Sequence, residues 1–390
     1  MGRQPAFDWT LFILGVLLSV SGLVFIYSAT WVSPDPPGIN FLDAQGRIGL
    51  AVKQGVFLLL SLIAFYFLRR LRWGLKPGTW LWFYLPAMFL LVLVLFIGRG
   101  PAPGVTRWIN LYFIDVQPSE FAKLALILIL AWLYSEESQR LTEKYLTALA
   151  LMLTMLALVA LQPDLGTAMV FLFIFFVMSA FIPIKRRWLV ATALAFIIAA
   201  IPAWFLLHDY QKNRILVYFG LELVPAEEGG GLRPASALST GYHVKQSLIA
   251  VGSGGWTGKG FLRGTQVRGG FVPEVQNDFI FALVAEEFGF FGCAYLLLLY
   301  FLLLARILAL SRDAVTLYER YICYGTSAVI FFHVLIAAGM TVGLTPVTGL
   351  PLPFVSYGGS SLMTMWLLLA INASVHASSR RDYRRIRTRR

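Results

Sequence analysis

Residues 272–292 read VPEVQNDFIFALVAEEFGFFG and lead from a polar segment into a long apolar run. The apolar run continues to about residue 305, which is long enough to cross a bilayer as a helix. Asp278 stands where the polar segment ends. A carboxylate at the edge of a membrane span is costly unless it has a role. The position makes Asp278 a candidate active-site residue.

The composition of the whole chain agrees with this local pattern. Hydrophobic residues make up 58% of the chain and charged residues 13%, which excludes an ordinary soluble protein. The apolar runs are continuous and rich in Leu, Phe and Ala rather than alternating, so helices are expected instead of a transmembrane barrel. We predict an all-α polytopic membrane protein with about ten spans, near residues 8–29, 48–68, 79–98, 117–135, 145–161, 164–182, 188–207, 278–305, 321–344 and 357–376.

The distribution of Lys and Arg predicts the orientation. Basic residues occur in the connection around Arg69 to Lys76, in Lys185 to Arg187, and after the last span. These segments share one side if both termini are cytoplasmic. We therefore expect one transmembrane domain over residues 1–379, with a large extracytoplasmic loop over residues 208–277. The basic cytoplasmic tail at 380–390, RRDYRRIRTRR, fits anionic lipid headgroups better than nucleic acid as the partner of a chain with net charge +12.

Asp278 has two interpretations from sequence alone. An Asp at a helix start is commonly a cap for free backbone amides, and Asn277 could share that task. Alternatively, the carboxylate takes part in chemistry. Glu286 follows eight residues later, about 12 Å deeper by helical rise, so we expect it to pair internally or to support packing instead.

Charged residues also occur at the outer ends of two other predicted spans. Glu120 and Lys123 are three residues apart in QPSEFAK (117–123) and face the same side of a helix, either as a self-neutralising pair or as part of a site. Arg107 is either a solvated loop arginine or a guanidinium that binds phosphate. Asp164 in QPDLGTA (162–168) is expected to cap its helix.

Two glycine-rich segments could bind an anion. GWTGKG at 255–260 superficially resembles a phosphate loop, but Gly260 replaces the Ser or Thr that would hold magnesium and no strand precedes it. Lys259 and nearby amides could still bind a pyrophosphate, or the glycines could simply form turns. Gly358, Gly359 and Ser360 at the start of the last span offer free amides or form a turn packed in the bundle. The four histidines are scattered without metal-ligand spacing, and we expect His333 to be a satisfied buried side chain.

Five segments together resemble the signature motifs of the SEDS family, which includes RodA, FtsW and their sporulation homologues. They are QPSEFAK (117–123), QPDLGTA (162–168), GYHVKQSLIAVGSGGWTGKGFLRGTQ (241–266), FVPEVQNDFIFALVAEEFGFFG (271–292) and GLTPVTGLPLPFVSYGGSS (343–361). The glycine-rich GSGGWTGKGFLRGTQ part is most similar to RodA. One departure is that Gln276 and Asn277 stand where relatives commonly have His-Thr.

The resemblance implies a peptidoglycan glycosyltransferase of the bacterial inner membrane that polymerises lipid II for cell-wall elongation. Its catalytic aspartate falls on Asp278, and other functional positions fall on Arg107, Glu120, Lys123 and Asp164. Implied partners are lipid II, a class B penicillin-binding transpeptidase and other elongation-complex membrane proteins. We expect a groove between spans beside Asp278 for the prenyl tails. No tightly bound cofactor is indicated, and a divalent cation stays open. The alternatives are a lipid II flippase or a non-enzymatic scaffold for the transpeptidase.

Overall fold

The computed structural model describes residues 7–31, 41–71, 78, 80–100, 105–111, 115–137, 140–224, 231–234, 240–272 and 274–387. In this part of the chain, the first half forms helices α1 (Trp9–Thr30), α2 (Phe41–Leu71), α3 (Trp80–Ile97), α4 (Pro118–Ser135), α5 (Leu141–Ala160), α6 (Leu165–Ala180) and α7 (Arg186–Leu206). The second half forms α8 (Asp209–Tyr218), α9 (Thr240–Gly254), α10 (Thr265–Arg268), α11 (Ile280–Asp313), α12 (Leu317–Thr341) and α13 (Gly359–Arg387).

The helices reproduce the predicted order of spans. Among the described residues, nine helices are long and apolar enough to cross a membrane, and α6 is a shorter apolar helix of 16 residues. These ten helices correspond one by one to the ten expected spans. The all-α polytopic fold class is therefore confirmed.

Several helices extend beyond the predicted spans: α2 begins at Phe41, α5 begins at Leu141 and α13 ends at Arg387. Two further differences have a local explanation. Helix α11 continues to Asp313 rather than ending near residue 305, because its backbone hydrogen bonds do not require apolar side chains. Helix α12 begins at Leu317 rather than near 321, because Thr316 and Glu319 form a capping box there. Hydropathy detects the apolar middle of a span and not its polar ends.

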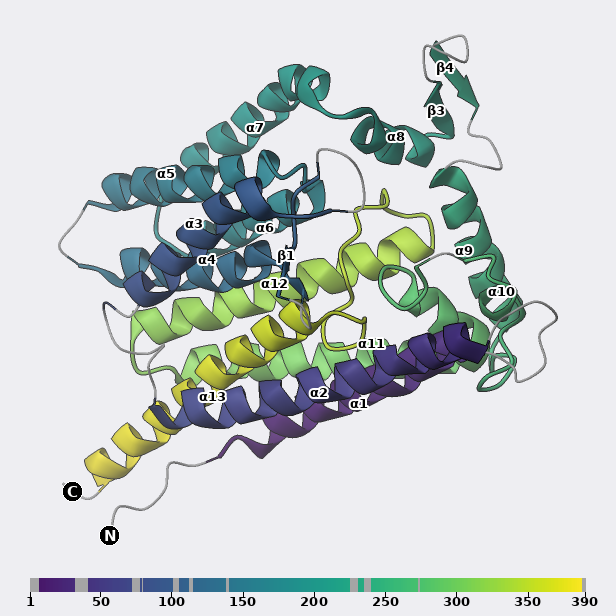
Figure 1. Cartoon of the computed structure of the whole chain (residues 1–390). Helices are drawn as coiled ribbons and strands as arrows, with labels where there is room; N and C mark the ends of the chain where they lie inside the picture. The colour runs from purple at the N-terminus through teal and green to yellow at the C-terminus, as the bar shows by residue number, and fades with distance from the viewer. Residues whose placement is uncertain are drawn as a thin grey trace.

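The spans lie side by side with loops gathered at the two ends (Figure 1). Helix α1 begins and α13 ends at one end, where Asp8 forms an ion pair of 2.8 Å with Arg306 of α11. Helices α8, α9 and α10 lie at the opposite end, together with the antiparallel pair β3 (Leu221–Val224) and β4 (Gly231–Pro234). A second short pair, β1 (Ile109–Asn110) and β2 (Asp115–Val116), leads into α4.

Burial separates central from peripheral spans. Helices α4 and α13 are the most buried of the candidate spans, whereas the side chains of α7 face almost entirely outward. The start of α13 is held by Gln54 of α2, whose side chain donates to the Ser356 carbonyl and accepts from the Gly358 amide. This contact fixes the turn before α13 at the end of the bundle that carries α8.

Candidate active site

A cavity of about 600 Å³ opens at the α8 end of the bundle. It collects polar side chains from α2, α4, α6, α8, the segment before α11 and the turn before α13. Its lining includes Lys53, Phe57, Arg99, Arg107, Trp108, Asp115, Gln117, Glu120, Asp164, Thr167, Arg214, Glu274, Asn277, Asp278, Gly349, Leu350, Pro351, Tyr357, Gly358, Gly359, Ser360 and Ser361. Seven of the nine site residues predicted from the sequence line this cavity, and the other two, Lys123 and Lys259, lie elsewhere.

Asp278 lines this cavity from the turn that precedes α11. The N-cap position of α11 is held by Phe279, and no side chain caps the helix there. Among the described residues, none donates a hydrogen bond to the Asp278 carboxylate. The capping interpretation is therefore not supported, and the carboxylate is left to face the cavity.

The surroundings of Asp278 set its acidity. Burial raises the pKa of Asp278 to about 6, although the nearby Arg214 guanidinium acts in the opposite direction and Glu274 adds to the rise. A carboxyl with this pKa is ionised at neutral pH and is a much stronger base than an ordinary aspartate.

The side chains of Arg214, from α8, and Asp278 both lie next to Gly349. Gly349 has a φ of +73°, and a Cβ there would be 3.1 Å from Arg214 Nη1 and 3.4 Å from Asp278 Oδ2. A side chain at this position would be strained and would crowd both charged groups. Sequence reasoning singled out the segment 208–277 but not Arg214, because no motif marks it.

Arg107 and Asp164 occupy the wall formed by the start of α6. Arg107 donates to the carbonyls of Gln162 and Pro163 and, over 3.1 Å, to the Tyr210 hydroxyl. Its Nη1 is 4.0 Å from Asp164 Oδ1. Asp164 caps α6 as predicted, since it accepts from the Thr167 amide over 3.2 Å. Arg107 is therefore held in place by backbone and is not a solvated loop arginine.

The start of α13 is joined to the entrance of α4. The Ser360 hydroxyl accepts from the Gln117 amide and donates to the Asp115 carbonyl, each over 3.1 Å. Gly358 and Gly359 line the cavity on the same side. Because the Gly358 amide already donates to Gln54, it is not free for an anion, which corrects the prediction for that amide.

Gln276 and Asn277, which replace the common His-Thr, connect Asp278 to the turn before α13 through their backbone. The Gln276 carbonyl accepts from the Tyr357 amide over 2.8 Å, and the Asn277 carbonyl accepts from the Ser356 hydroxyl over 2.6 Å. Side-chain identity at these two positions is not needed for either bond.

Glu120 and Lys123 form a buried pair of 2.7 Å in α4. Lys123 is 0% exposed and also contacts His333 Nε2 over 3.1 Å, so it does not reach the cavity as a phosphate ligand. His333 Nδ1 is 3.1 Å from the Pro351 carbonyl, which places the ring proton on Nδ1 and leaves Nε2 to accept from Lys123. His333 is thus a satisfied buried side chain, as predicted. Glu120 lines the cavity, and its Oε2 is buried without a hydrogen-bond partner among the described residues.

Lys259 lies away from the cavity, contrary to the prediction that it binds a pyrophosphate there. Its Nζ is 2.6 Å from Glu286 Oε1 and 2.7 Å from the Thr265 hydroxyl. The ion pair with a fully buried carboxylate holds the ammonium at α11. Glu286 pairs internally, as expected.

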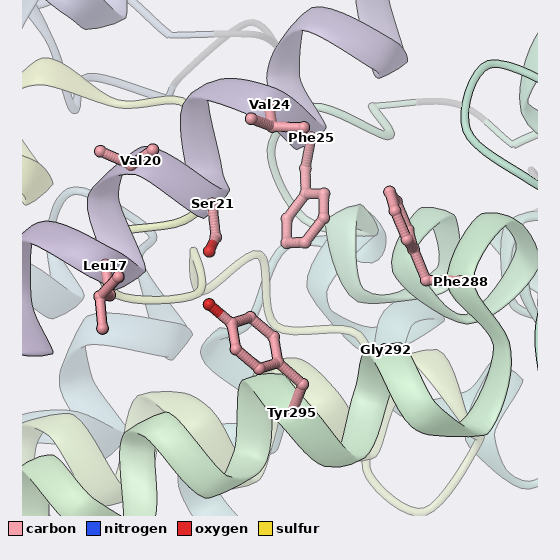
Figure 2. Close-up of a pocket in the computed structure, with 8 residues that line it drawn as sticks. All are labelled: Leu17, Val20, Ser21, Val24, Phe25, Phe288, Gly292 and Tyr295. Carbon is pink, nitrogen blue, oxygen red and sulfur yellow. The ribbon is translucent and has the colours of Figure 1, made fainter.

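A smaller hollow of about 240 Å³ lies between α1 and α11 (Figure 2). Its lining is apolar except for the hydroxyls of Ser21 and Tyr295, which point toward each other. No residue lines both hollows, so this one is not the groove expected beside Asp278. Within the described part of the chain, no group of three or more His, Cys, Asp or Glu side chains could hold a metal ion.

The arrangement of the five motifs agrees with a comparison to known families. Residues 8–381 match the family described as "Cell cycle protein", named after FtsW, RodA and SpoVE. The chain belongs to the FtsW/RodA/SpoVE family. Within this family, the peptidoglycan glycosyltransferase MrdB of Escherichia coli is 37% identical over 304 residues, covering 75% of this chain and 77% of the relative.

Other members of the FtsW/RodA/SpoVE family are similar over nearly the whole length. Stage V sporulation protein E of Bacillus subtilis is 34% identical, covering 97% of this chain and 99% of the relative. A structure described as a peptidoglycan synthase complex superposes with a TM-score of 0.75 at 31% identity, covering 96% of this chain and 98% of that one. The crystal structure of RodA from Thermus thermophilus gives a TM-score of 0.66 at 30% identity, covering 95% of this chain and 97% of that one.

Proposed function

We propose that this protein is a peptidoglycan glycosyltransferase that polymerises lipid II into glycan strands for cell-wall elongation. The names of its relatives support the reaction class, since MrdB and RodA are described as peptidoglycan glycosyltransferases. One observation carries the proposal: the Asp278 carboxylate lines the cavity, its pKa is raised to about 6, and it does not cap α11.

Asp278 acts as the general base in this proposal. It accepts the proton of a sugar hydroxyl on the acceptor, whose oxygen then attacks the anomeric carbon of the donor glycan. The bond from that carbon to the pyrophosphate breaks, the configuration inverts, and undecaprenyl pyrophosphate leaves. A base with a pKa near the operating pH is suited to this step.

The leaving pyrophosphate needs positive charge where its negative charge develops. Arg107 and Arg214 supply two guanidiniums close to Asp278, and Lys53 and Arg99 add two more cations to the cavity wall. The amides of Gly359 and Ser360 at the start of α13 add hydrogen-bond donors. Glu120 and Asp164 face the same space and are suited to sugar hydroxyls, which donate to carboxylates.

The proposal places the enzyme in the bacterial inner membrane with its cavity on the extracytoplasmic side. The basic segments at the opposite end of the bundle support this orientation. A class B transpeptidase is the expected partner, because a structural neighbour is described as a complex that coordinates polymerization and crosslinking.

Purified protein supplied with labelled lipid II tests the function directly. We expect a ladder of glycan polymers on gels that a muramidase degrades, and the assay is run with and without the cognate transpeptidase. A flippase or a scaffold would yield no polymer, with or without the partner, and that result would refute the proposal.

The rate should depend on pH through Asp278. The base works only when ionised, so the rate should fall about tenfold per pH unit below pH 6 and level off above it. Because Arg214 lowers the pKa of Asp278, Arg214→Gln should move the midpoint of this profile to higher pH. The measurement is the initial rate of polymerisation from pH 4.5 to 8.

Arg99→Gln is the matched control for this profile. Arg99 lines the same cavity but is not among the groups that shift the pKa of Asp278, so its loss should slow the reaction without moving the midpoint. An unchanged or lower midpoint in Arg214→Gln would contradict the placement of Arg214 beside the base.

A further inference from the structure

Helix α11 is interrupted at Gly289, and another segment fills the break. Gly289 has φ 62° and ψ −156°, outside the helical region. Residues 254–264, here called the inserted segment, satisfy the backbone groups around it. The Lys259 amide donates to the Glu286 carbonyl over 2.9 Å, and the Phe290 amide donates to the Gly255 carbonyl over 2.9 Å. A Cβ on Gly289 would lie 2.3 Å from the Gly258 nitrogen, so only glycine fits here.

Two buried carboxylates fasten this junction. Glu286 binds the Lys259 ammonium and accepts from the amides of Gln266 and Val267 over 2.8 and 3.1 Å. Glu287 accepts from the Ser28 hydroxyl of α1 over 2.7 Å. The inserted segment is therefore fixed to α11 at the level where α1 ends.

The contacts between α1 and α11 mark the thickness of the membrane region. At one end Asp8 pairs with Arg306, and at the other Ser28 contacts Glu287. Along the unbroken α1, the helical rise from residue 8 to residue 28 is about 30 Å, close to the roughly 30 Å of the hydrocarbon layer. The inserted segment consequently lies at the hydrocarbon boundary on the cavity side.

Three aromatic rings point outward at this boundary. Trp256 is 68% exposed, and it contacts Phe290 and Phe291, which are 55% and 60% exposed, at ring distances of 5.0 and 6.2 Å. An exposed apolar cluster of this kind is unusual on a surface that faces water. Tryptophan with neighbouring aromatic rings is typical of the membrane interface.

The charges next to the aromatic rings fit lipid headgroups. Residues 241–273 contain four Lys or Arg and no Asp or Glu. Of these cations, Lys245, Arg263 and Arg268 are exposed. A basic segment that adjoins an aromatic boundary complements the anionic lipids of a leaflet.

We propose that Trp256, Phe290 and Phe291 form an anchor in the interface of the cavity-side leaflet that sets the depth of the active site. Helical rise from Glu287 to Ile280 is about 10 Å, so the anchor holds Asp278 outside the hydrocarbon, above the headgroup layer. A pyrophosphate attached to a membrane lipid would lie in that layer, with its first sugar at the level of Asp278. This last step rests on the proposed function, whereas the anchor itself does not.

Spin labelling tests the anchor without any activity. Trp256→Cys in a chain that also carries Cys293→Ser and Cys323→Ala is labelled and reconstituted in nanodiscs containing phosphatidylglycerol. We expect the label to collide more with oxygen, which concentrates in lipid, than with a water-soluble nickel chelate. Asp209→Cys in the same background is the control, since the Asp209 side chain is 85% exposed on α8 and its label should favour the chelate.

A label at position 256 that favours the chelate would overturn the proposal and indicate a surface for water or a soluble partner. Should the Trp256 variant fail to fold, a label in place of Phe261 on the inserted segment, whose ring is 42% exposed, gives the same readout. A label at Phe291 alone would not test the anchor, because Phe291 lies in the α11 span and its label should favour oxygen whether or not Trp256 lies in the interface.

Activity measured in detergent and in bilayers distinguishes a membrane anchor at Trp256 from a role of this side chain in packing. Trp256→Ser should polymerise lipid II at the wild-type rate in detergent but about tenfold more slowly in bilayers, whereas Trp256→Tyr should keep both rates. An equal loss in detergent would contradict the anchor. If the wild type itself makes no polymer, the proposed function fails, and the spin-label result still decides the anchor.

Discussion

Asp278→Asn should abolish polymerisation while leaving the protein folded. Loss of a general base lowers the rate by about 100- to 10,000-fold, and asparagine cannot accept the proton. The two side chains have nearly the same shape, and Asp278 neither caps α11 nor accepts a hydrogen bond from the described residues. The measurement is the amount of glycan polymer per unit time together with the midpoint of thermal unfolding.

Asp278→Asn should also change the thermal stability of the protein, in a way that depends on pH. The pKa of Asp278 is raised from 3.8 to about 6 in the folded protein, so ionisation of this carboxyl disfavours the fold; the penalty grows between these two pH values and is complete above the higher one. Asparagine removes this penalty, and the thermal midpoint at pH 7.5 should be equal to or slightly above that of the wild type, with less difference at pH 5. Asp209→Asn, an exposed carboxylate outside the cavity lining, serves as a control that should retain full activity. Substantial polymer formation by Asp278→Asn would refute the role of the base.

Lys123→Met should strongly destabilise the protein. Lys123 is completely buried, and its removal leaves the Glu120 carboxylate without the charge 2.7 Å away. Breaking a buried ion pair from one side costs about 3–5 kcal/mol, whereas replacing both partners by uncharged groups is often neutral. The double variant Glu120→Gln/Lys123→Met should therefore unfold at a clearly higher temperature than Lys123→Met, although below the wild type, because His333 Nε2 loses the ammonium 3.1 Å away. The unfolding midpoints in detergent measure the difference.

The double variant also tests whether the Glu120–Lys123 pair is only structural or takes part in the reaction. Glu120 lines the cavity with an oxygen that has no hydrogen-bond partner in the part of the chain that the structure describes. We therefore expect the double variant to polymerise lipid II at least about tenfold more slowly. Normal activity in the double variant would make the pair purely structural. Equal instability of the single and double variants would contradict the account of the pair itself.

Much of the fold and part of the site could be predicted from sequence because the relevant signals are local. A continuous apolar run determines a span wherever it occurs, which is why all ten were found in order. Asp164 was assigned as a cap from its position before Leu165, and capping depends only on the next three residues. Asp278 stood out because its charge lies next to a long apolar helix.

The errors arose where position depends on contacts between distant segments. Arg214 carries no motif, and it reaches Asp278 only because α8 folds back over the turn at Gly349. Lys259 was assigned to a phosphate from its glycine-rich neighbours, but the break at Gly289 brings it to Glu286 instead. The spacing of Glu120 and Lys123 showed that they pair, but not which of the two faces the cavity. Helical periodicity predicts which side chains are neighbours on the same helix, but it does not predict which side chains of other helices they contact.

The bonds of Ser360 to the Gln117 amide and the Asp115 carbonyl have a consequence for biogenesis. They close the cavity wall between the beginning of α4 and the beginning of α13, which is synthesised long after α4. A nascent chain therefore lacks this part of the cavity wall until α13 has packed against α4.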